Sequence, residues 1–369
     1  MDFSWSDEQT AFRKEVARFA REELQDDVIE RDRQQEFFWD GWRKCGRFGI
    51  QSLPVPAEFG GSGSDALTTV GALEGLGYGC RDNGLLFSLN THMWGAEIPV
   101  ASFGSEAQKQ RYLPKLASGE WLGVMAAAEA GNANVLQTRA RRSSNGYVLT
   151  GAKTFVTQAA DAELIVVLAD LESASGTSAT SAFLVEKGTA GLTVTRRLRK
   201  MGLRTSPMAE LSLTDCEVPF ENLLGNEGQG GEILKTSMEW ESICGLASYI
   251  GIMQRLGETS LEYSRERKQF GQPIGKFAAI ARKITDMEVR LESSRLLLYK
   301  AAWLKTRGQD SSREAAMAKT YLGDSCVQSC LDAIQIHGGY GYMTEFQFER
   351  DLRDAISARI YLGCLEVPA

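Results

Sequence analysis

The sequence contains only two histidines among its 369 residues, His92 and His337. A serine–histidine hydrolase, or a metal centre built from several histidines, would need one of them as its base or ligand, so these classes are disfavoured. His92 lies in the apolar helical stretch Leu85 to Val100, where we expect a structural role with its ring hydrogen-bonded. His337 precedes two glycines, and it either lines a cofactor site or caps the helix before it.

Other absences exclude further classes of protein. No run approaches 18 uncharged apolar residues, so we expect no helix that crosses a membrane. The acidic start, Met1 to Glu8, has no basic segment followed by an apolar one, which predicts that it is not a secretion signal. A net charge of −7 argues against nucleic acid as the main partner. The chain has no Walker A motif, and Gly338-Gly-Tyr-Gly341 lacks the dinucleotide-binding spacing, so a Rossmann enzyme is not expected.

The seven cysteines are scattered and odd in number, which predicts free thiols in a reducing cytoplasm. Cys326 and Cys330 lie four residues apart on one predicted helix, but without further ligands they are too few for a zinc site. We therefore expect a cytoplasmic protein without a bound metal. A hydrophobic content of 43% and a charged content of 24% are typical of a globular protein.

The pattern of apolar residues changes twice along the chain, which predicts three domains and an α+β fold. Residues 1–118 have helical spacing at 66–79, 83–101 and 105–117, and Ser6 with Gln9 forms a plausible capping box before the first helix. Between residues 119 and 225, six short segments rich in Val, Leu, Ile and Thr alternate with polar loops, which predicts an antiparallel β-barrel or sandwich. Residues 226–369 carry four long amphipathic patterns, which predict a four-helix bundle with helices at 228–265, 276–307, 311–336 and 345–365.

One segment between the first two bundle helices combines cations, an aromatic ring and glycines. It runs Tyr263-Ser-Arg-Glu-Arg-Lys-Gln-Phe-Gly-Gln-Pro-Ile-Gly-Lys276. Guanidinium groups offer forked donors to phosphate oxygens, and a flat ring packs on another aromatic group. The segment therefore suits a diphosphate that carries an aromatic group, although an ordinary turn between helices with solvated charges explains the pattern equally well.

A second segment decides between these two interpretations. It runs Gln335-Ile-His-Gly-Gly-Tyr-Gly-Tyr-Met-Thr-Glu345 and is followed by Glu349-Arg350 and Arg353-Asp354. Together the two segments closely resemble the acyl-CoA dehydrogenase family of flavoproteins, and the resemblance extends over nearly the whole chain. It implies a helical domain, a β-domain and a four-helix bundle, with flavin adenine dinucleotide (FAD) between the β-domain and the bundle. It also implies an assembly of at least two subunits, a homodimer or a homotetramer.

The resemblance implies two sets of cofactor contacts. Gly151-Ala-Lys-Thr-Phe-Val-Thr157 looks like the family's second flavin strand, so Phe155 and Thr157 would lie against the isoalloxazine ring. The other set would serve the flavin of a neighbouring subunit. In that set Arg267, Gln269 and Phe270 would contact the cofactor, with Arg267 serving phosphate and Phe270 packing near the ring system. Gln335 and Gly339 would close round its diphosphate.

The chemistry that this resemblance implies requires a carboxylate. It removes a proton from the carbon next to a thioester carbonyl, while hydride passes from the β-carbon to flavin N5. Most family members carry that glutamate in a Tyr-Glu-Gly-Thr stretch near the C-terminus, but the matching residues here are Tyr361-Leu-Gly-Cys364. Leu362 cannot take a proton, although its main-chain N–H can still polarise the thioester carbonyl of the substrate.

A minority of the family, including the isovaleryl and long-chain types, places the base on the first bundle helix. The matching segment Ile250-Gly-Ile-Met-Gln254 puts that position at Glu241. Gly245 lies four residues further, so it shares a helix face with Glu241 and leaves room for a substrate chain. Glu239 points to the other side of the helix and is the weaker candidate. Without the resemblance, Glu241 would be interpreted as a solvated charge.

Three departures from the family pattern leave a further hypothesis open, a degenerate homologue that binds an acyl group or a partner without oxidising it. The flavin loop is shortened and stripped of its hydroxyls, as Ala126-Ala-Ala-Glu-Ala-Gly-Asn-Ala-Asn134. The threonine and glutamine that serve the adenine end are replaced by Cys364 and Glu366, and the arginine that follows the alternative base is Ser242.

Within the family, the closest resemblance is to dehydrogenases of natural-product pathways, of the prolyl-carrier-protein type. The segments that match are 77–87, 237–241 and 290–299. The implied substrate is an acyl or aminoacyl thioester on a carrier protein, with free CoA thioesters as the alternative. A basic docking patch for an acidic carrier protein is expected at Arg196, Arg197, Arg199 and Lys200. The sequence does not identify the acyl group or the electron acceptor.

Overall fold

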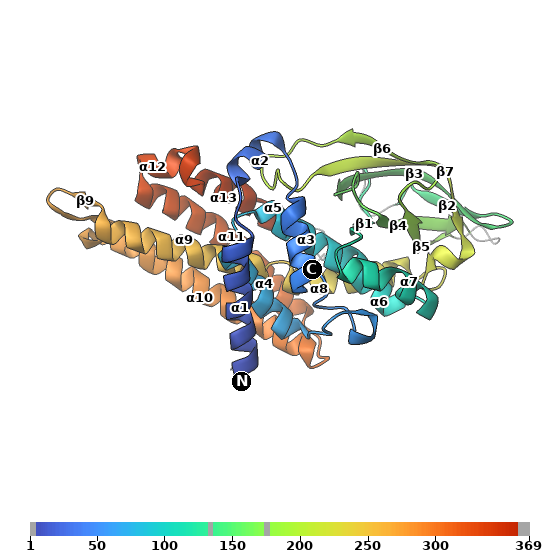
Figure 1. The fold of residues 1–369 in the computed structure, drawn as a ribbon, viewed down its shortest axis with the longest axis horizontal. Coiled ribbons are helices and arrows are strands. Elements are labelled where there is room, and N and C mark those ends of the chain that lie inside the picture. The colour runs from blue at the N-terminus through green and yellow to red at the C-terminus, as the bar shows by residue number, and fades with distance from the viewer. Residues whose placement is uncertain (1–4, 132–135, 173–177, 361–369) are drawn as a thin grey trace.

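The computed structural model describes residues 5–131, 136–172 and 178–360. In chain order it consists of a group of helices, a β-domain and a long helical bundle (Figure 1). The first group contains α1 (Asp7–Glu23), α2 (Val28–Gln34), α3 (Trp39–Phe48), α4 (Ala66–Gly79), α5 (Asn83–His92), α6 (Ile98–Phe103) and α7 (Glu106–Ala117). The α+β class expected from the sequence is confirmed.

Two of these helices begin at complete capping boxes. Ser6 accepts a hydrogen bond from the Gln9 N–H, and the Gln9 side chain bonds back to the Ser6 N–H. Ser105 and Gln108 make the same reciprocal pair before α7. Each pair satisfies two backbone donors that the first turn of a helix leaves open. The capping box expected at Ser6 is therefore confirmed.

Helix α4 is apolar on all sides because it packs between α1 and the bundle. Twelve of its fourteen residues are buried. Its glycines allow the close approach: a Cβ at Gly75 would lie 2.5 Å from the Arg13 carbonyl oxygen, and one at Gly77 would lie 2.0 Å from the Ser248 carbonyl oxygen. A helix that is hydrophobic all round is expected to be buried all round.

The β-domain is one sheet with strand order β6-β7-β3-β2-β4-β5-β8, in which β1 also pairs with β4. The strands are β1 (Gly123–Ala126), β2 (Arg139–Arg142), β3 (Gly146–Thr157), β4 (Leu164–Glu172), β5 (Ser178–Glu186), β6 (Leu192–Arg197), β7 (Met208–Pro219) and β8 (Leu223–Leu224). Most pairs are antiparallel, whereas β1 and β2 run parallel to β4. Strand β2 was not predicted, because its sequence Arg-Ala-Arg-Arg has only one apolar position.

The bundle contains α8 (Gly230–Cys244), α9 (Ala247–Glu266), α10 (Ala278–Thr306) and α11 (Ser312–His337), followed by α12 (Gly339–Tyr342), α13 (Phe348–Ala355) and α14 (Ser357–Ile360). The single helix predicted over 228–265 is wrong, because Gly245 and Leu246 interrupt it between α8 and α9. The helix predicted over 345–365 is likewise divided into α13 and α14 in its described part.

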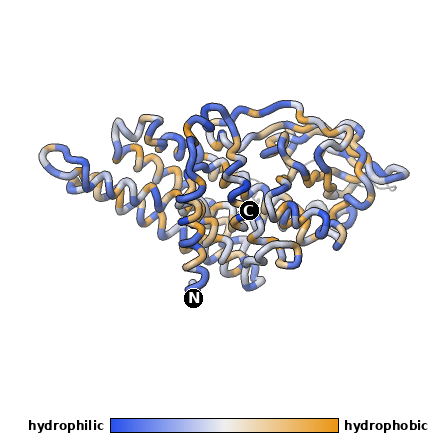
Figure 2. The backbone as a smooth tube through the Cα atoms, in the orientation of Figure 1, coloured by the Kyte–Doolittle hydropathy of each residue, from blue (hydrophilic) through white to orange (hydrophobic). Residues whose placement is uncertain are grey.

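The strands β9 (Lys268–Gln269) and β10 (Gln272–Pro273) form a hairpin that projects from the end of the bundle (Figure 1). This tip is hydrophilic, whereas hydrophobic segments gather inside the molecule (Figure 2). Among the helices of the described residues, none combines the length and apolarity needed to cross a membrane.

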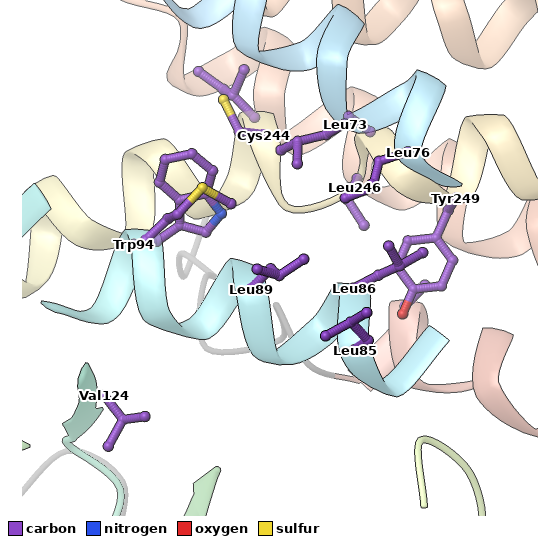
Figure 3. Close-up of a cluster of buried hydrophobic side chains, with 14 of the residues drawn as sticks. Leu73, Leu76, Leu85, Leu86, Leu89, Trp94, Val124, Cys244, Leu246 and Tyr249 are labelled. Carbon is purple, nitrogen blue, oxygen red and sulfur yellow. The ribbon is translucent and has the colours of Figure 1, made fainter. Parts of the chain in front are cut away.

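A buried apolar core lies where α4, α5, α8 and α9 meet (Figure 3). Leucines from α4 and α5 face one another across it, together with Trp94, Leu246 and Tyr249. Burial of each such side chain contributes about 2 kcal/mol relative to exposure. This core holds the α8–α9 break against α5. Glu241, the candidate base, lies one helical turn before that break.

Candidate functional site

Glu241 occupies the last turn of α8, and its side chain lies beside the helix break. A Cβ built on Gly245 would lie 3.6 Å from the Glu241 Cγ. Ser237, one turn earlier, is buried, and its hydroxyl donates a hydrogen bond of 2.6 Å to the Trp94 carbonyl oxygen. The face that carries Ser237, Glu241 and Gly245 is therefore turned toward the segment after α5.

Glu239 is held elsewhere. Its carboxylate lies 3.5 Å from the Lys305 ammonium on α10 and 4.0 Å from the Lys235 ammonium. Because these lysines engage it on the outer side of α8, Glu239 is committed to surface ion pairs. The two acids of this turn thus occupy different surroundings, as the helical period requires.

Two tryptophan rings stack on each other at α8, and one of them, Trp240, directly precedes Glu241 in the chain. The Trp94 ring is fully buried and stacks on the Trp240 ring, with centroids 5.7 Å apart and an interplanar angle of 11°. The Trp94 indole N–H donates a bond of 2.8 Å to Asn90 Oδ1, which fixes its rotamer. Trp94 belongs to a π-helical turn, Met93–Glu97, between α5 and α6. Such turns occur often at functional sites, and the sequence contains no signal that predicts this one.

Phe155, on β3, has the geometry of a platform for a flat ligand. Its side chain is 65% exposed and its φ is +54°, which is a rare conformation for an aromatic residue. The pairing of β3 with β7 shifts register between Lys153 and Val156, so Phe155 lies in a bulge. Thr157, two residues on, is buried at the end of the strand. The bulge turns the ring of Phe155 out of the sheet.

A buried ion pair supports this bulge. The Lys153 ammonium lies 2.6 Å from Glu129 Oε1, and both side chains are almost completely buried. Glu129 also accepts hydrogen bonds from the N–H groups of Gln137 and Thr138. Burial lowers the pKa of Lys153, and although burial alone would raise the pKa of Glu129, the bonds from Lys153 and the backbone lower it. The pair therefore ties the shortened loop after β1 to the strand that carries Phe155.

Gln158 follows the predicted flavin strand and was missed by the sequence analysis. Its φ is +56°, it is fully buried, and its Nε2 donates a bond of 2.9 Å to the Ser88 hydroxyl. Its Oε1 has no hydrogen-bond partner within the described chain. A buried acceptor without a partner is costly, so it marks a position where a ligand or a water molecule is needed.

The second predicted set gathers at the end of the bundle that lies away from the β-domain (Figure 1). Arg267, Gln269 and Phe270 are exposed on the β9–β10 hairpin, and Phe270 is 92% exposed. Gln335 and Gly339 are exposed at the end of α11 and the start of α12. Stacking of Tyr263 on His337, at 4.3 Å, brings the ends of α9 and α11 together. The structure thus groups these five residues and separates them from Phe155 and Thr157.

Both histidines have structural contacts. His337 Nδ1 lies 2.8 Å from the Ala333 carbonyl oxygen, and burial lowers the pKa of its ring, so the capping role is favoured. His92 is fully buried, and its Nδ1 accepts the Gly123 N–H at 2.9 Å. Its Nε2 therefore carries the proton and donates toward Glu97, at 3.1 Å. The structural role expected for His92 fits these contacts.

Several predicted positions lie outside the described residues, among them Leu362 and the segment 132–135 of the flavin loop. Within residues 5–131, 136–172 and 178–360, no three His, Cys, Asp or Glu side chains are grouped so that they could hold a metal ion.

Comparison with known proteins gives matches along almost the entire chain. Models of the acyl-CoA dehydrogenase N-terminal, middle and C-terminal domains match residues 6–120, 127–216 and 228–369. The L-prolyl-peptidyl-carrier-protein dehydrogenase of Pseudomonas fluorescens is 37% identical over 367 residues, which cover 98% of this chain and 96% of the relative.

Solved structures give the same picture. The prolyl acyl carrier protein oxidase AnaB superposes with a TM-score of 0.94 at 45% identity, covering 98% of this chain and 96% of that one. The structure of PigA with FAD and proline also superposes with a TM-score of 0.94, at 38% identity and with the same coverage.

Proposed function

The chain belongs to the acyl-CoA dehydrogenase family, and we propose that it is an FAD-dependent enzyme that forms a double bond between the α- and β-carbons of a thioester. The thioester is an acyl or aminoacyl group on a carrier protein of a biosynthetic pathway, the type of substrate that the relatives named above act on. The observation that carries this proposal is the position of Glu241 in the last turn of α8, one turn before Gly245 and next in the chain to Trp240, whose ring stacks on Trp94.

The residues around β3 fit a bound flavin. Phe155 offers an exposed ring held out of the sheet by a bulge, and Thr157 and Gln158 follow it with a buried hydroxyl and an unpartnered acceptor. When bound, FAD supplies the hydride acceptor for the reaction. Phe155 would pack on the flat ring system, and Thr157 would hydrogen-bond its edge.

The second set fits the diphosphate of a flavin bound by a neighbouring subunit. Arg267 offers forked donors to phosphate, and Phe270 offers an exposed ring beside it. A Cβ at Gly339 would meet no atom within 4 Å, so the backbone there is open to a close approach. Gln335 and Gln269 complete the donor set. The separation of this set from β3 supports a site shared between two subunits.

Glu241 acts as the base in this proposal. Its carboxylate takes the proton from the α-carbon, and the stacked pair of Trp94 and Trp240, the residue before Glu241, would help to keep water away from this turn of α8. The main-chain N–H of Leu362 would donate to the thioester oxygen. One such donor is worth about 3–4 kcal/mol of transition-state stabilisation.

The shared flavin site requires at least two copies of the chain. A groove of about 840 Å³ runs between α10 and α11, and its lining includes Leu297, Met317 and Tyr321. Val289 and Leu296 on α10 are also more than half exposed. Exposed apolar surface of this kind marks protein interfaces. We assign this face to contact with a second copy, in a homodimer or a homotetramer.

The carrier-docking patch expected from the sequence is smaller than four residues. Arg196 pairs with Glu210 at 2.6 Å, and the Lys200 ammonium is turned inward to the Ser206 carbonyl oxygen. Arg197 and Arg199 are exposed and have no acidic partner in the described part of the chain. These two arginines remain available to an acidic carrier protein. The described cysteines are free and buried, which suits an enzyme of the cytoplasm.

Anaerobic mixing of the yellow protein with substrate tests the proposal. We expect the flavin absorbance near its visible maximum to bleach with a prolyl or short acyl group on a carrier protein and to change much less with the corresponding CoA ester. Equal bleaching by the CoA ester would favour a catabolic acyl-CoA dehydrogenase, the second candidate that the family supports. A protein that takes up no FAD would contradict both and leave the degenerate acyl- or partner-binding homologue.

A further inference from the structure

The loop between β6 and β7, residues 198–207, contacts the bundle through α13. The Leu203 N–H donates a hydrogen bond of 2.5 Å to Asp354 Oδ1, and Arg353 Nη1 donates one of 3.0 Å to the Met201 carbonyl oxygen. Between them, a Cβ at Gly202 would lie 2.3 Å from the Arg353 carbonyl oxygen. Only glycine permits this approach, so residues 201–203 rest directly on α13.

The same loop holds the end of the flavin strand. The Gln158 N–H donates a bond of 2.7 Å to the Pro207 carbonyl oxygen. The Ser206 hydroxyl lies 2.7 Å from the Ser88 hydroxyl on α5, and Ser88 in turn accepts from the Gln158 side chain. Gln158 directly follows Thr157. Loop 198–207 therefore joins the strand that carries Phe155 and Thr157 to α13 at one end and to α5 at the other.

Asp354 is the point at which all three parts of the molecule meet. Its carboxylate accepts bonds from Leu203 of the β-domain, from Asn83 Nδ2 of α5 at 2.9 Å, and from Arg350 on its own helix at 3.4 Å. It is 2% exposed. Leu203 has a φ of +50°, a strained conformation that persists only when its surroundings hold it.

The contacts of Asp354 with Leu203, Asn83 and Arg350 are not explained by a gain in stability of the fold. Burial raises the pKa of Asp354 to about 6, and burial lowers the pKa of the neighbouring Lys200 to about 8, so each charge is costly where it lies. Arg350 Nε and Asn83 Oδ1 have no partner within the described residues. Replacing buried charges with apolar groups often leaves a protein as stable or more stable, so such groups are best explained by the geometry that they enforce.

We propose that Asp354 is a positioning residue for the flavin site: by holding loop 198–207 on α13, it sets the flavin strand of the β-domain against the bundle that carries Glu241. This inference rests on the proposed function, because it assumes that FAD lies between Phe155 and the bundle. Without the Asp354–Leu203 bond, the loop is free to shift, and the end of β3 shifts with it.

The matched control is Asp351, on the same helix. It is also buried and accepts a bond of 3.0 Å from Asn83 Nδ2, and it lies 3.7 Å from Arg255 Nη2, yet it makes no hydrogen bond to loop 198–207 in the described structure. Asp354→Ala and Asp351→Ala therefore remove the same kind of group from the same helix. Only the first variant releases the loop.

The test measures three quantities for both variants: the midpoint of thermal unfolding, the Kd for FAD, and kcat and KM with the carrier-bound substrate. We expect Asp354→Ala to raise the Kd for FAD about tenfold or more and to lower kcat with little change in KM. The two variants should change the unfolding midpoint by similar amounts, while the Kd of Asp351→Ala for FAD stays within about twofold of the wild type.

A second variant keeps the proposal testable if Asp354→Ala does not fold. Gly202→Ala pushes the loop away from α13 from the other side and leaves Asp354 intact, so it should weaken FAD binding in the same way. FAD affinity unchanged in both variants, or lowered equally by Asp351→Ala, would overturn the inference while leaving the proposed function standing. Failure of the wild-type protein to bind FAD would instead overturn the proposed function.

Discussion

Gly245 lies one helical turn after Glu241, so close that a Cβ on it would come within 3.6 Å of the Glu241 Cγ. The glycine therefore does more than end α8. It places no side chain beside Glu241 on the side toward the α8–α9 break, whereas Ser237, one turn earlier, donates a hydrogen bond to the Trp94 carbonyl oxygen. In the proposed function, the acyl group of the substrate lies where Gly245 leaves out a side chain.

The first prediction fills that space. Gly245→Val places a branched side chain beside Glu241, and because its Cβ would also lie 2.6 Å from the Glu241 carbonyl oxygen, the end of α8 must shift to accept it. We expect kcat to fall about tenfold or more while the protein keeps its FAD, because the base is crowded but β3 is untouched. Gly257→Val on α9, where a Cβ would meet no atom within 4 Å, is the control and should retain full activity.

The second prediction separates cofactor binding from stability at Phe155. Replacing Phe155 by glycine removes the exposed ring and also relieves the strain of its φ of +54°. The protein without FAD should gain about 1 kcal/mol in free energy of unfolding, while the Kd for FAD rises at least about tenfold. Urea denaturation and flavin fluorescence titration measure the two effects. A loss of stability together with unchanged affinity would show that the ring belongs to the fold and not to the cofactor site.

The third prediction concerns the site shared between subunits. Glu241→Gln and Arg267→Ala homo-oligomers should each be inactive or nearly so. In a mixed dimer, one of the two sites collects both substitutions and the other collects neither. Because half of randomly mixed dimers are mixed, co-expression should restore about a quarter of wild-type activity. No recovery in purified mixed dimers would place Arg267 in the same site as the Glu241 of its own chain.

The fourth prediction follows from the titration of Asp354. Burial raises its pKa from 3.8 to about 6 in the folded protein. Folding therefore favours the protonated form, and the stability that this group contributes is present below about pH 4 and lost as the pH rises through about 6. Asp354→Asn removes this dependence. Relative to the wild type, the variant should gain up to about 3 kcal/mol in free energy of unfolding between pH 4 and pH 7.

Urea denaturation of both proteins at several pH values measures that difference. Asp351→Asn is the control on the same helix. If the difference in free energy of unfolding between the wild type and Asp354→Asn stays constant from pH 4 to pH 7, the pKa of Asp354 is not raised in the folded protein.

The sequence predicts the three-part fold well. Apolar periodicity and capping boxes depend on residues that are close together in the chain, and the family resemblance extends over nearly the whole chain. These rules fail where contacts between residues far apart in the sequence decide whether a segment is a strand or a helix. Strand β2 has almost no apolar pattern and pairs because β3 and β4 lie on either side of it. The break at Gly245 lies inside a continuous amphipathic pattern, and a single glycine does not reveal whether a helix bends, ends or continues.

The candidate site likewise has residues that the sequence predicts and supporting contacts that it does not. Glu241, Phe155 and Arg267 are predicted from motifs, and the structure shows how they are presented. The supports behind them depend on contacts between residues far apart in sequence. The Asp354–Leu203 bond joins positions 151 residues apart, and the Gln158–Ser88 bond joins positions 70 apart. No spacing rule within one sequence connects such pairs, so the sequence predicts a docking role for Arg199 and Lys200 but not the contact of loop 198–207 with α13.

Rapid anaerobic mixing of the Glu241→Gln variant with carrier-bound substrate tests most directly whether Glu241 removes the α-proton. We expect this variant to bind FAD like the wild type and its flavin to bleach at least about a thousandfold more slowly. Glu239→Gln, two residues away in the same turn, should bleach at the wild-type rate. Bleaching of Glu241→Gln at the wild-type rate would show that Glu241 is not the base.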